Sequence, residues 1–223
     1  MASPVRLTVL ISGSGTNLQA LIDATASPSS SISNAQIVRV ISNRKNAYGL
    51  TRAHNASIPT TIHNLISNGY TKRFPNSDPG SKAATAPARE AFDADVAAII
   101  LADKPDIVVM AGWMHIVSPT FLIPLAEAGV KLINLHPALP GEYSGAEAID
   151  RAWNDWQAGK IQRTGCMIHR VIAEVDMGAP VVKQEIPFRL NESKEAFEER
   201  FHSVEHELIV QGTRQLVDEV QAR

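Results

Sequence analysis

An asparagine and a histidine stand two positions apart in Asn134-Leu135-His136-Pro137, directly after a short apolar run. Alternate side chains of a strand point to the same face, so Asn134 and His136 would converge while Leu135 faces the other way. A carboxamide can donate a hydrogen bond to a developing oxyanion and an imidazole can carry a proton, which together suit chemistry at an acyl-type carbon. The same pattern is also compatible with ordinary capping and turn formation.

A carboxylate further along the chain could complete this pair. Asp176 lies in the turn-like segment Val175-Asp176-Met177-Gly178-Ala179-Pro180. If this segment folds back over His136, the carboxylate would orient the imidazole and raise its pKa above the ordinary value of about 6.5. The alternative is that Asp176 only forms a hydrogen-bonded turn before Gly178.

A glycine-rich segment between the first apolar run and the first helical pattern could bind an anion. Its sequence is Ser12-Gly13-Ser14-Gly15-Thr16-Asn17. Backbone N–H groups in such a loop, together with a helix N-terminus, favour a phosphate. A dinucleotide site would need a glycine where Leu18 stands and an acid where Asn43-Arg44-Lys45 stands, and the P-loop lysine is also missing. The segment indicates a phosphate monoester or a simple tight turn and leaves the reaction open.

A different chemistry is suggested by His202-Ser203-Val204-Glu205-His206, which matches the H-x-x-E-H pattern of one class of zinc peptidases. Both histidines would lie on one face of a helix. Short patterns of this kind are common by chance, and a third ligand could come only from Asp218 or Glu219. A zinc peptidase is therefore kept as an alternative from another class, and no metal is expected.

Composition limits the class of protein. The chain has 223 residues, 44% hydrophobic and 20% charged, with a net charge of −2. These values suit one well-buried α/β domain over residues 1–223 and do not suggest a nucleic-acid partner. Cys166 is the single cysteine, so no intramolecular disulfide can form, and a small buried side chain is expected there. Without a leader-like start or an apolar segment of about 18 residues, we expect a cytoplasmic protein with no membrane partner.

Short apolar runs alternate with helix-length segments up to residue 135. This alternation is typical of a parallel sheet covered by helices on both faces. Ligands bind such sheets beyond the carboxyl ends of the strands, which is where Asn134 and His136 would lie. Strands are predicted at 5–11, 37–41, 58–63, 106–110 and 131–135, and helices at 18–25, 48–55 and 87–103.

After about residue 160 the pattern changes. The runs at 164–171 and 180–188 are expected to pair antiparallel, because the connection between them is too short for a helical crossover. A long terminal helix follows, capped by Asn191 or Ser193. The segment 67–86 is rich in Ser, Asn, Pro and Gly, and it is predicted to be an exposed loop that the chemistry does not need.

Taken in order along residues 5–212, several segments resemble the glycinamide ribonucleotide formyltransferases. The first is the stretch from Leu10 through the glycine-rich segment to Ile22. The others are Ile41-Ser42-Asn43-Arg44, Arg89-Glu90-Ala91-Phe92-Asp93, Ala111-Gly112-Trp113-Met114, Asn134-Leu135-His136-Pro137, Asp176-Met177-Gly178-Ala179-Pro180-Val181 and Glu205-His206. The resemblance implies a Rossmann-like formyltransferase fold: an open, mostly parallel α/β sheet with C-terminal antiparallel strands and a long terminal helix.

The resemblance also implies an activity. Enzymes of this family transfer a formyl group from 10-formyltetrahydrofolate to the amine of glycinamide ribonucleotide in purine synthesis. Asn134 would be the oxyanion donor, His136 the proton donor, and Asp176 the group that raises the histidine pKa. The ribonucleotide would be bound by Gly15, Thr16, Asn17 and Glu205. The folate would contact Asn134 together with Arg89, Met114, His115, Ile116, Val117, Ile172, Ala173, Glu174 and Val175.

Three departures from the family pattern are visible. His115 stands where arginine is usual, Glu147 follows Gly145-Ala146 where many members have a histidine, and segment 67–86 is longer than usual.

Two alternative functions are known for proteins of the same fold. One is a formyltetrahydrofolate hydrolase and the other is a methionyl-tRNA formyltransferase, and each of these enzymes carries a further domain. A non-catalytic phosphate-binding module would not need Asn134, His136 and Asp176 together. Only small-molecule partners are expected, with the protein a monomer or a weak homodimer.

Overall fold

Seven strands form one sheet in the computed structural model, which describes residues 3–75 and 86–222. Their order across the sheet is β3-β2-β1-β4-β5-β6-β7. Strands β1 to β5 are parallel, β6 is antiparallel to β5, and β7 is antiparallel to β6, as the sequence predicts. The bounds are β1 (Val5–Ile11), β2 (Ala35–Ser42), β3 (Thr60–Ile62), β4 (Ile107–Met110), β5 (Lys131–His136), β6 (Arg163–Arg170) and β7 (Pro180–Pro187).

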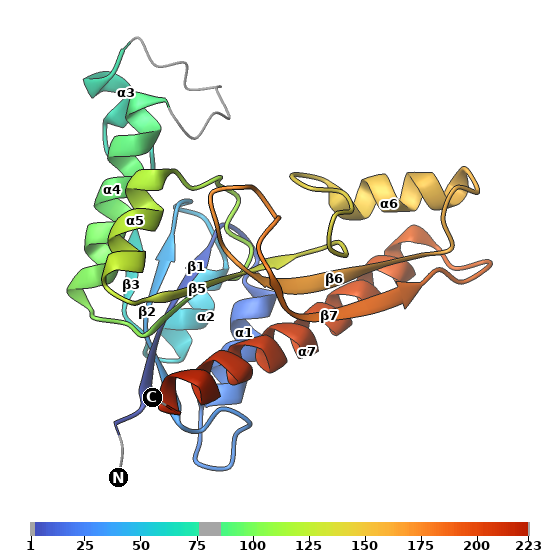
Figure 1. The fold of residues 1–223 in the computed structure, drawn as a ribbon, viewed down its shortest axis with the longest axis horizontal. Coiled ribbons are helices and arrows are strands. Elements are labelled where there is room, and N and C mark those ends of the chain that lie inside the picture. The colour runs from blue at the N-terminus through green and yellow to red at the C-terminus, as the bar shows by residue number, and fades with distance from the viewer. Residues whose placement is uncertain (1–2, 76–85, 223) are drawn as a thin grey trace.

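Helices lie on both faces of this sheet (Figure 1). One face is covered by α1 and α7, and the other by α4 and α5. Ser193 caps α7 by accepting a hydrogen bond from the N–H of Ala196 at 3.2 Å. The bounds are α1 (Thr16–Thr25), α2 (Gly49–Asn55), α3 (Tyr70–Arg73), α4 (Pro87–Ala102), α5 (Pro119–Glu127), α6 (Ala148–Gln157) and α7 (Lys194–Gln221).

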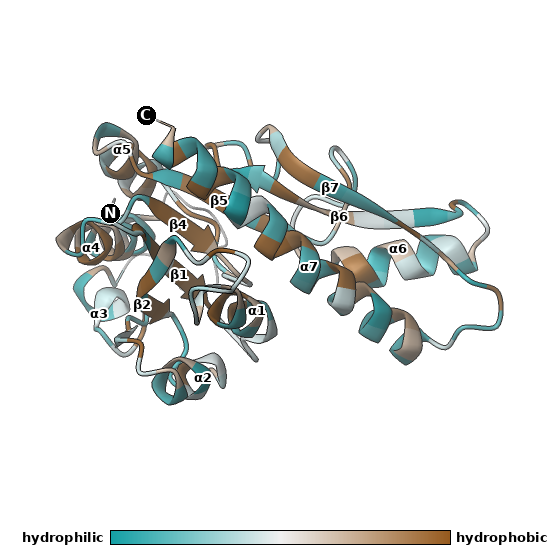
Figure 2. Cartoon of the chain, turned by 90° about the horizontal axis from the view of Figure 1, so that it is seen from below, coloured by the Kyte–Doolittle hydropathy of each residue, from teal (hydrophilic) through white to brown (hydrophobic). Residues whose placement is uncertain are grey.

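The apolar side chains of strand β1 pack into two hydrophobic clusters, one on each face of the sheet. Leu7 and Val9 belong to the cluster beneath α1 and α7, whereas Leu10 belongs to the cluster beneath α4 and α5. Successive side chains of a strand alternate between faces, so a strand buried on both sides is apolar throughout. The hydrophobic central strands β1, β2 and β4 are visible between the helices in Figure 2.

The C-terminal part extends to one side of the parallel sheet (Figure 1). Helix α7 packs against α1 and also against β6 and β7, so it joins the parallel strands to the antiparallel pair. Helix α6 attaches to this extension through aromatic rings. Trp156 stacks on Phe188 at 4.8 Å between ring centroids, and Trp153 contacts Phe197 at 5.3 Å. Cys166 in β6 is fully buried, as expected.

The prediction of an exposed loop over 67–86 is wrong for its first part. Tyr70, at the start of α3, is only 2% exposed and packs edge-on against Phe92 at 5.6 Å between centroids. Its hydroxyl contacts His63 Nε2 at 2.7 Å and donates a hydrogen bond to Asp95. One large aromatic side chain with polar partners therefore anchors a segment whose average composition is polar. Residues 76–85 of that segment lie outside the described residues.

Helices α5 and α6 were not anticipated from the sequence. Helix α5 contains Pro124, which interrupts the usual helical signal, although Phe121 and Leu125 are buried beneath it. In α6, Ile149, Trp153 and Trp156 have the i, i+4, i+7 spacing that could have revealed the helix. Among the helices of residues 3–75 and 86–222, none is long and apolar enough to cross a membrane.

Candidate active site

The carboxyl end of β5 presents Asn134 and His136 on one face. Leu135 between them is 7% exposed and belongs to the hydrophobic core on the opposite face, which confirms the predicted alternation. His136 is the last residue of the strand and is 3% exposed. Its Nε2 is buried without a hydrogen-bond partner among the described residues, so this nitrogen is available to a bound substrate.

The β6–β7 connection folds back over His136, as the sequence-based hypothesis required. Asp176 Oδ2 lies 3.4 Å from His136 Nδ1 and accepts a hydrogen bond from the N–H of Gly145 at 2.9 Å. Asp176 has a φ of 58°, so it is also a turn residue in the left-handed region, which Asp tolerates better than most side chains. Asp176 is therefore both a turn residue and a neighbour of the His136 ring.

A second buried histidine, His169 in β6, was missed from the sequence. Antiparallel pairing places His169 opposite Asn134, and the two side chains meet at 3.1 Å between Nδ2 and Nε2. His169 Nδ1 donates to the carbonyl oxygen of Arg170 at 2.9 Å, because a carbonyl can only accept. Its Nε2 therefore faces Asn134 and lies 3.6 Å from Asp176 Oδ1. His169 fixes the orientation of the Asn134 amide.

Burial controls the protonation of this cluster. It lowers the pKa of His136 below the ordinary value, and although the charge of Asp176 acts in the opposite direction, it does not reverse the shift. The expectation that the His136 pKa would lie above 6.5 is therefore wrong. Burial raises the pKa of Asp176, but contacts with His169 and the Gly145 N–H outweigh it, so the pKa is lowered overall. Near neutral pH the carboxylate is charged and the His136 ring mainly neutral.

The glycine-rich segment forms the turn from β1 into α1. Gly15 is the N-cap residue, with a φ of 71° in the left-handed region. The side chain of Asn17 hydrogen-bonds to Glu205 on α7, so these two predicted substrate contacts, far apart in the sequence, lie together. Burial raises the pKa of Glu205 to about 8, since only Asn17 offsets the loss of solvation. Glu205 is 6% exposed.

The residues predicted to contact folate fall on two loops, on helix α4 and, with Asn134, on strand β5. Met114, Ile116 and Val117 lie between β4 and α5, and Arg89 on α4 donates to the carbonyl oxygen of Ile116 at 3.4 Å. The N–H of Met114 donates to Ser12 Oγ at 2.8 Å, which ties this loop to the glycine-rich segment. The other loop holds residues 172–175, of which Ile172 and Val175 are 44% and 39% exposed.

His115 differs from its neighbours in this loop. Its Nε2 lies 2.8 Å from Asp93 Oδ1, and the side chain is 6% exposed. The ring also contacts Phe92 and Trp113. The His115 side chain therefore anchors the β4–α5 loop to α4, and only its backbone is left to contact a ligand in this loop.

A family model described as formyl transferase matches residues 5–213 of the chain. The phosphoribosylglycinamide formyltransferase of Schizosaccharomyces pombe is 48% identical, over 95% of this chain and 96% of that protein. The chain belongs to the phosphoribosylglycinamide formyltransferase family. The member of this family from Saccharomyces cerevisiae is 44% identical, over 96% of this chain and 98% of that protein.

Solved structures agree with this family assignment. Glycinamide ribonucleotide transformylase 1 from Symbiobacterium toebii superimposes with a TM-score of 0.79 at 28% identity, covering 98% of this chain and 90% of that one. Because these matches span nearly the whole chain, the alternatives of a hydrolase, a tRNA formyltransferase, a zinc peptidase and a non-catalytic module are not favoured. In the part of the chain that the structure describes, no three His, Cys, Asp or Glu side chains converge as metal ligands.

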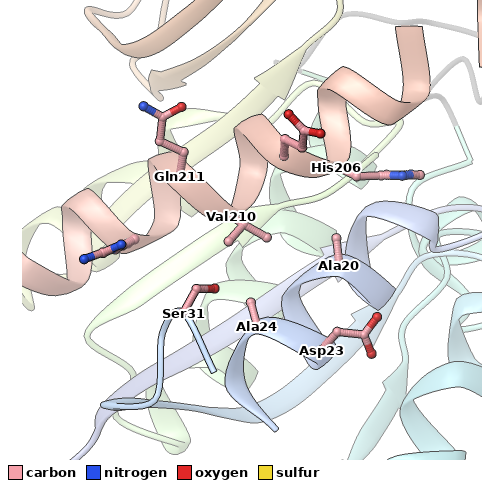
Figure 3. A pocket seen from close by; sticks show the side chains of 9 residues that line it. Ala20, Asp23, Ala24, Ser31, His206, Val210 and Gln211 are labelled. Carbon is pink, nitrogen blue, oxygen red and sulfur yellow. The ribbon is translucent and has the colours of Figure 1, made fainter. Parts of the chain in front are cut away.

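A groove in this formyltransferase-family chain lies away from the Asn134–His136–Asp176 cluster. It has a volume of about 560 Å³ and runs between α1 and α7 (Figure 3). Ala20, Ala24 and Val210 form its apolar part, with His206 at one end. Its lining contains none of the residues predicted to catalyse the transfer or to bind the two substrates, although it includes His206, which follows Glu205 directly.

Proposed function

We propose that this chain transfers the formyl group of 10-formyltetrahydrofolate to the amine of 5'-phosphoribosylglycinamide, giving formylglycinamide ribonucleotide and tetrahydrofolate in purine biosynthesis. Family membership supports the reaction class. The observation that carries the proposal is the convergence of Asn134, His136 and Asp176 at the sheet edge that also holds the glycine-rich turn. A carboxamide, an imidazole and a carboxylate in this arrangement suit acyl transfer to an amine.

Asn134, His136 and Asp176 are proposed as the catalytic residues. The substrate amine attacks the formyl carbon, and Asn134 donates a hydrogen bond to the resulting oxyanion. The His136 ring, mainly neutral before attack, accepts the proton of the new ammonium and donates it to the departing folate nitrogen. The carbon–nitrogen bond to folate then breaks. Asp176 stabilises the imidazolium that exists between these two proton transfers.

The two substrates are proposed to occupy separate parts of this edge. N–H groups at the start of α1 would bind the ribonucleotide phosphate, with Glu205 contacting the same substrate further out. The folate would lie against the exposed apolar side chains of the two loops, among them Met114, Ile116 and Ile172. The proposed ribonucleotide contacts are Gly15, Thr16, Asn17 and Glu205. The proposed folate contacts are Arg89, Met114, His115, Ile116, Val117, Asn134, Ile172, Ala173, Glu174 and Val175.

We further propose that residues 1–223 act as one catalytic domain. Helix α7 supports this, because it packs against both the parallel and the antiparallel strands. The reaction needs no metal, since the substrate amine is itself the nucleophile. A cytoplasmic location and a monomeric or weakly dimeric state remain part of this proposal, as does the absence of membrane and nucleic-acid partners.

A direct assay tests the function. Purified protein is mixed with 10-formyltetrahydrofolate and 5'-phosphoribosylglycinamide, and both products are quantified. The proposal requires formylated ribonucleotide and tetrahydrofolate in equal amounts. Reactions with glycine in place of the ribonucleotide, and without any acceptor, separate transfer from hydrolysis. Release of formate without formylated product would contradict the proposed transfer and show that the protein is a hydrolase.

A further inference from the structure

Helix α2 lies directly against the glycine-rich turn. A Cβ atom added to Gly15 would lie 2.5 Å from Gly49 Cα, closer than side chains approach a backbone. Gly49 also donates its N–H to the carbonyl oxygen of Gly13 at 3.1 Å. The conformation of the turn is therefore set by contact with α2 as well as by its own sequence.

Arg52 continues this contact from the next turn of α2. Its Nε donates to the carbonyl oxygen of Ser14 at 3.0 Å, and Nη1 donates to Gln19 Oε1 at 3.2 Å. The guanidinium carbon lies 5.1 Å from the ring centroid of Tyr48. Arg52 makes no salt bridge with a carboxylate in residues 3–75 and 86–222, so no described acid neutralises it directly.

Peptide geometry turns these contacts into an orientation for the turn. In a trans peptide, the C=O of one residue and the N–H of the next point in opposite directions. Holding the carbonyls of Gly13 and Ser14 against α2 therefore directs the N–H groups of Ser14 and Gly15 away from α2. Neither N–H donates to another described residue. Successive free N–H groups of this kind form an anion-binding concavity.

We infer that Arg52 is a positioning residue of the phosphate site: it holds the Ser14 carbonyl so that the turn presents its N–H groups to the phosphate monoester of the ribonucleotide, and it adds an unneutralised positive charge beside them. This inference rests on the proposed function. The site recognises the phosphate, so Arg52 contributes to ribonucleotide binding and not to the transfer step.

The test compares Arg52→Gln and Arg52→Lys with the unaltered protein, using two acceptors, the phosphorylated glycinamide ribonucleoside and its dephosphorylated form. For Arg52→Gln, KM for the phosphorylated acceptor should rise at least about tenfold, the scale of losing a charge-assisted hydrogen bond. The kcat, the KM for 10-formyltetrahydrofolate and the kcat/KM for the dephosphorylated acceptor should stay within about twofold. Arg52→Lys keeps the charge and should recover part of the loss.

Arg214→Gln serves as the matched control, because it removes one exposed positive charge of α7 that makes no hydrogen bond or ion pair with the turn among the described residues. It should leave all four constants unchanged. If Arg52→Gln lowers kcat/KM for both acceptors in the same proportion, or leaves both unchanged, the inference is overturned. If Arg52→Gln does not fold, Arg52→Lys is compared with the unaltered protein instead. The inference is then overturned if kcat/KM falls in the same proportion for both acceptors or is unchanged for both. An inactive unaltered protein would instead contradict the proposed function itself.

Discussion

At the scale of single residues, the proposed site depends on His136 having two different sides. Nδ1 faces the carboxylate of Asp176, whereas Nε2 is buried without a partner among the described residues. Burial favours the neutral ring and Asp176 favours the charged one, so the balance between them sets the proton affinity of the ring. A proton-transfer group that must both accept and donate works best when neither form dominates strongly.

Replacing Asp176 by Asn should lower the pKa of His136 further, because it removes the charge that opposes burial. Asn fits the left-handed backbone and can still accept from the Gly145 N–H, so the turn should persist. We expect turnover to fall at least about tenfold with only a modest change in the KM for the ribonucleotide. The pH–rate profile and the NMR titration of His136 measure both effects, with His136→Ala giving the rate without this group. An unshifted titration with near-normal turnover would leave Asp176 as a turn residue only.

Glu205 should make the protein less stable as pH rises. Its pKa is raised from 4.5 to about 8 in the folded state, so the folded protein holds a proton that the unfolded chain has lost between these values. The free energy of unfolding should therefore decline from about pH 4.5 to about pH 8. Glu205→Gln cannot ionise and should be more stable than the unaltered protein at pH 9, by a few kcal/mol at most. Urea unfolding at pH 5 and pH 9 measures this difference.

The exposed Glu207 on the same helix provides the control. Glu207→Gln should leave the pH dependence of unfolding as it is in the unaltered protein. Equal slopes for Glu205→Gln and the unaltered protein would mean that Glu205 is ionised in the folded state.

The contribution of His169 marks the limit of sequence reasoning at this scale. Asn134 and His136 were predictable because they are neighbours in one strand, and Asp176 because the family resemblance includes its turn. His169 meets Asn134 only through the register of β5 against β6, which no local pattern specifies. The sign of the His136 pKa shift was missed for a similar reason, since it depends on how deeply the ring is buried.

At the scale of elements, the buried parallel strands were the most predictable, because burial on both faces demands continuous apolar runs. Short or irregular helices were the least predictable. Helix α5 contains Pro124, a residue that argues against a helix in the sequence, and α3 depends on one aromatic residue within a polar segment. In both cases tertiary contacts, and not the local pattern, stabilise the helix.

The anchoring of α3 can be measured at Tyr70. Tyr70→Ala removes a buried ring that packs edge-on against His63 and Phe92, and it should destabilise the protein by about 3 kcal/mol or more. Tyr70→Phe keeps the ring and loses only the hydroxyl contacts, so it should cost about 1 kcal/mol. Urea unfolding of both variants provides the values. A Tyr70→Ala protein as stable as the unaltered one would show that α3 contributes nothing to the fold.

At the scale of the whole molecule, α7 spans both parts of the sheet. Leu208, Ile209, Leu216 and Val217 are buried in the core cluster that also contains β1 and α1. Earlier turns of the helix pack Phe197 and Phe201 into the same cluster, near the rings of α6. The parallel strands and the C-terminal extension therefore share one helix and one core (Figure 1).

This sharing predicts a single cooperative unfolding transition. Far-ultraviolet circular dichroism, which follows all helices, should give the same midpoint as the fluorescence of Trp153 and Trp156 in the extension, recorded in a Trp113→Phe variant. Deleting residues 208–223 should unfold both parts together, because it removes buried side chains from the common core. Two separated midpoints would instead define two independently folding units.

The pairing of Asn134 with His169 restricts where related sequences can gain or lose residues. A residue inserted into the exposed 158–162 connection between α6 and β6, which holds no proposed site residue, can be absorbed by the loop. One inserted within β6 before His169 would shift the strand by one position and turn every following side chain to the opposite face. His169 would then leave Asn134 for the other side of the sheet. Gaps are thus expected to accumulate in connections that hold no proposed site residue, while β6 should be inherited at fixed length.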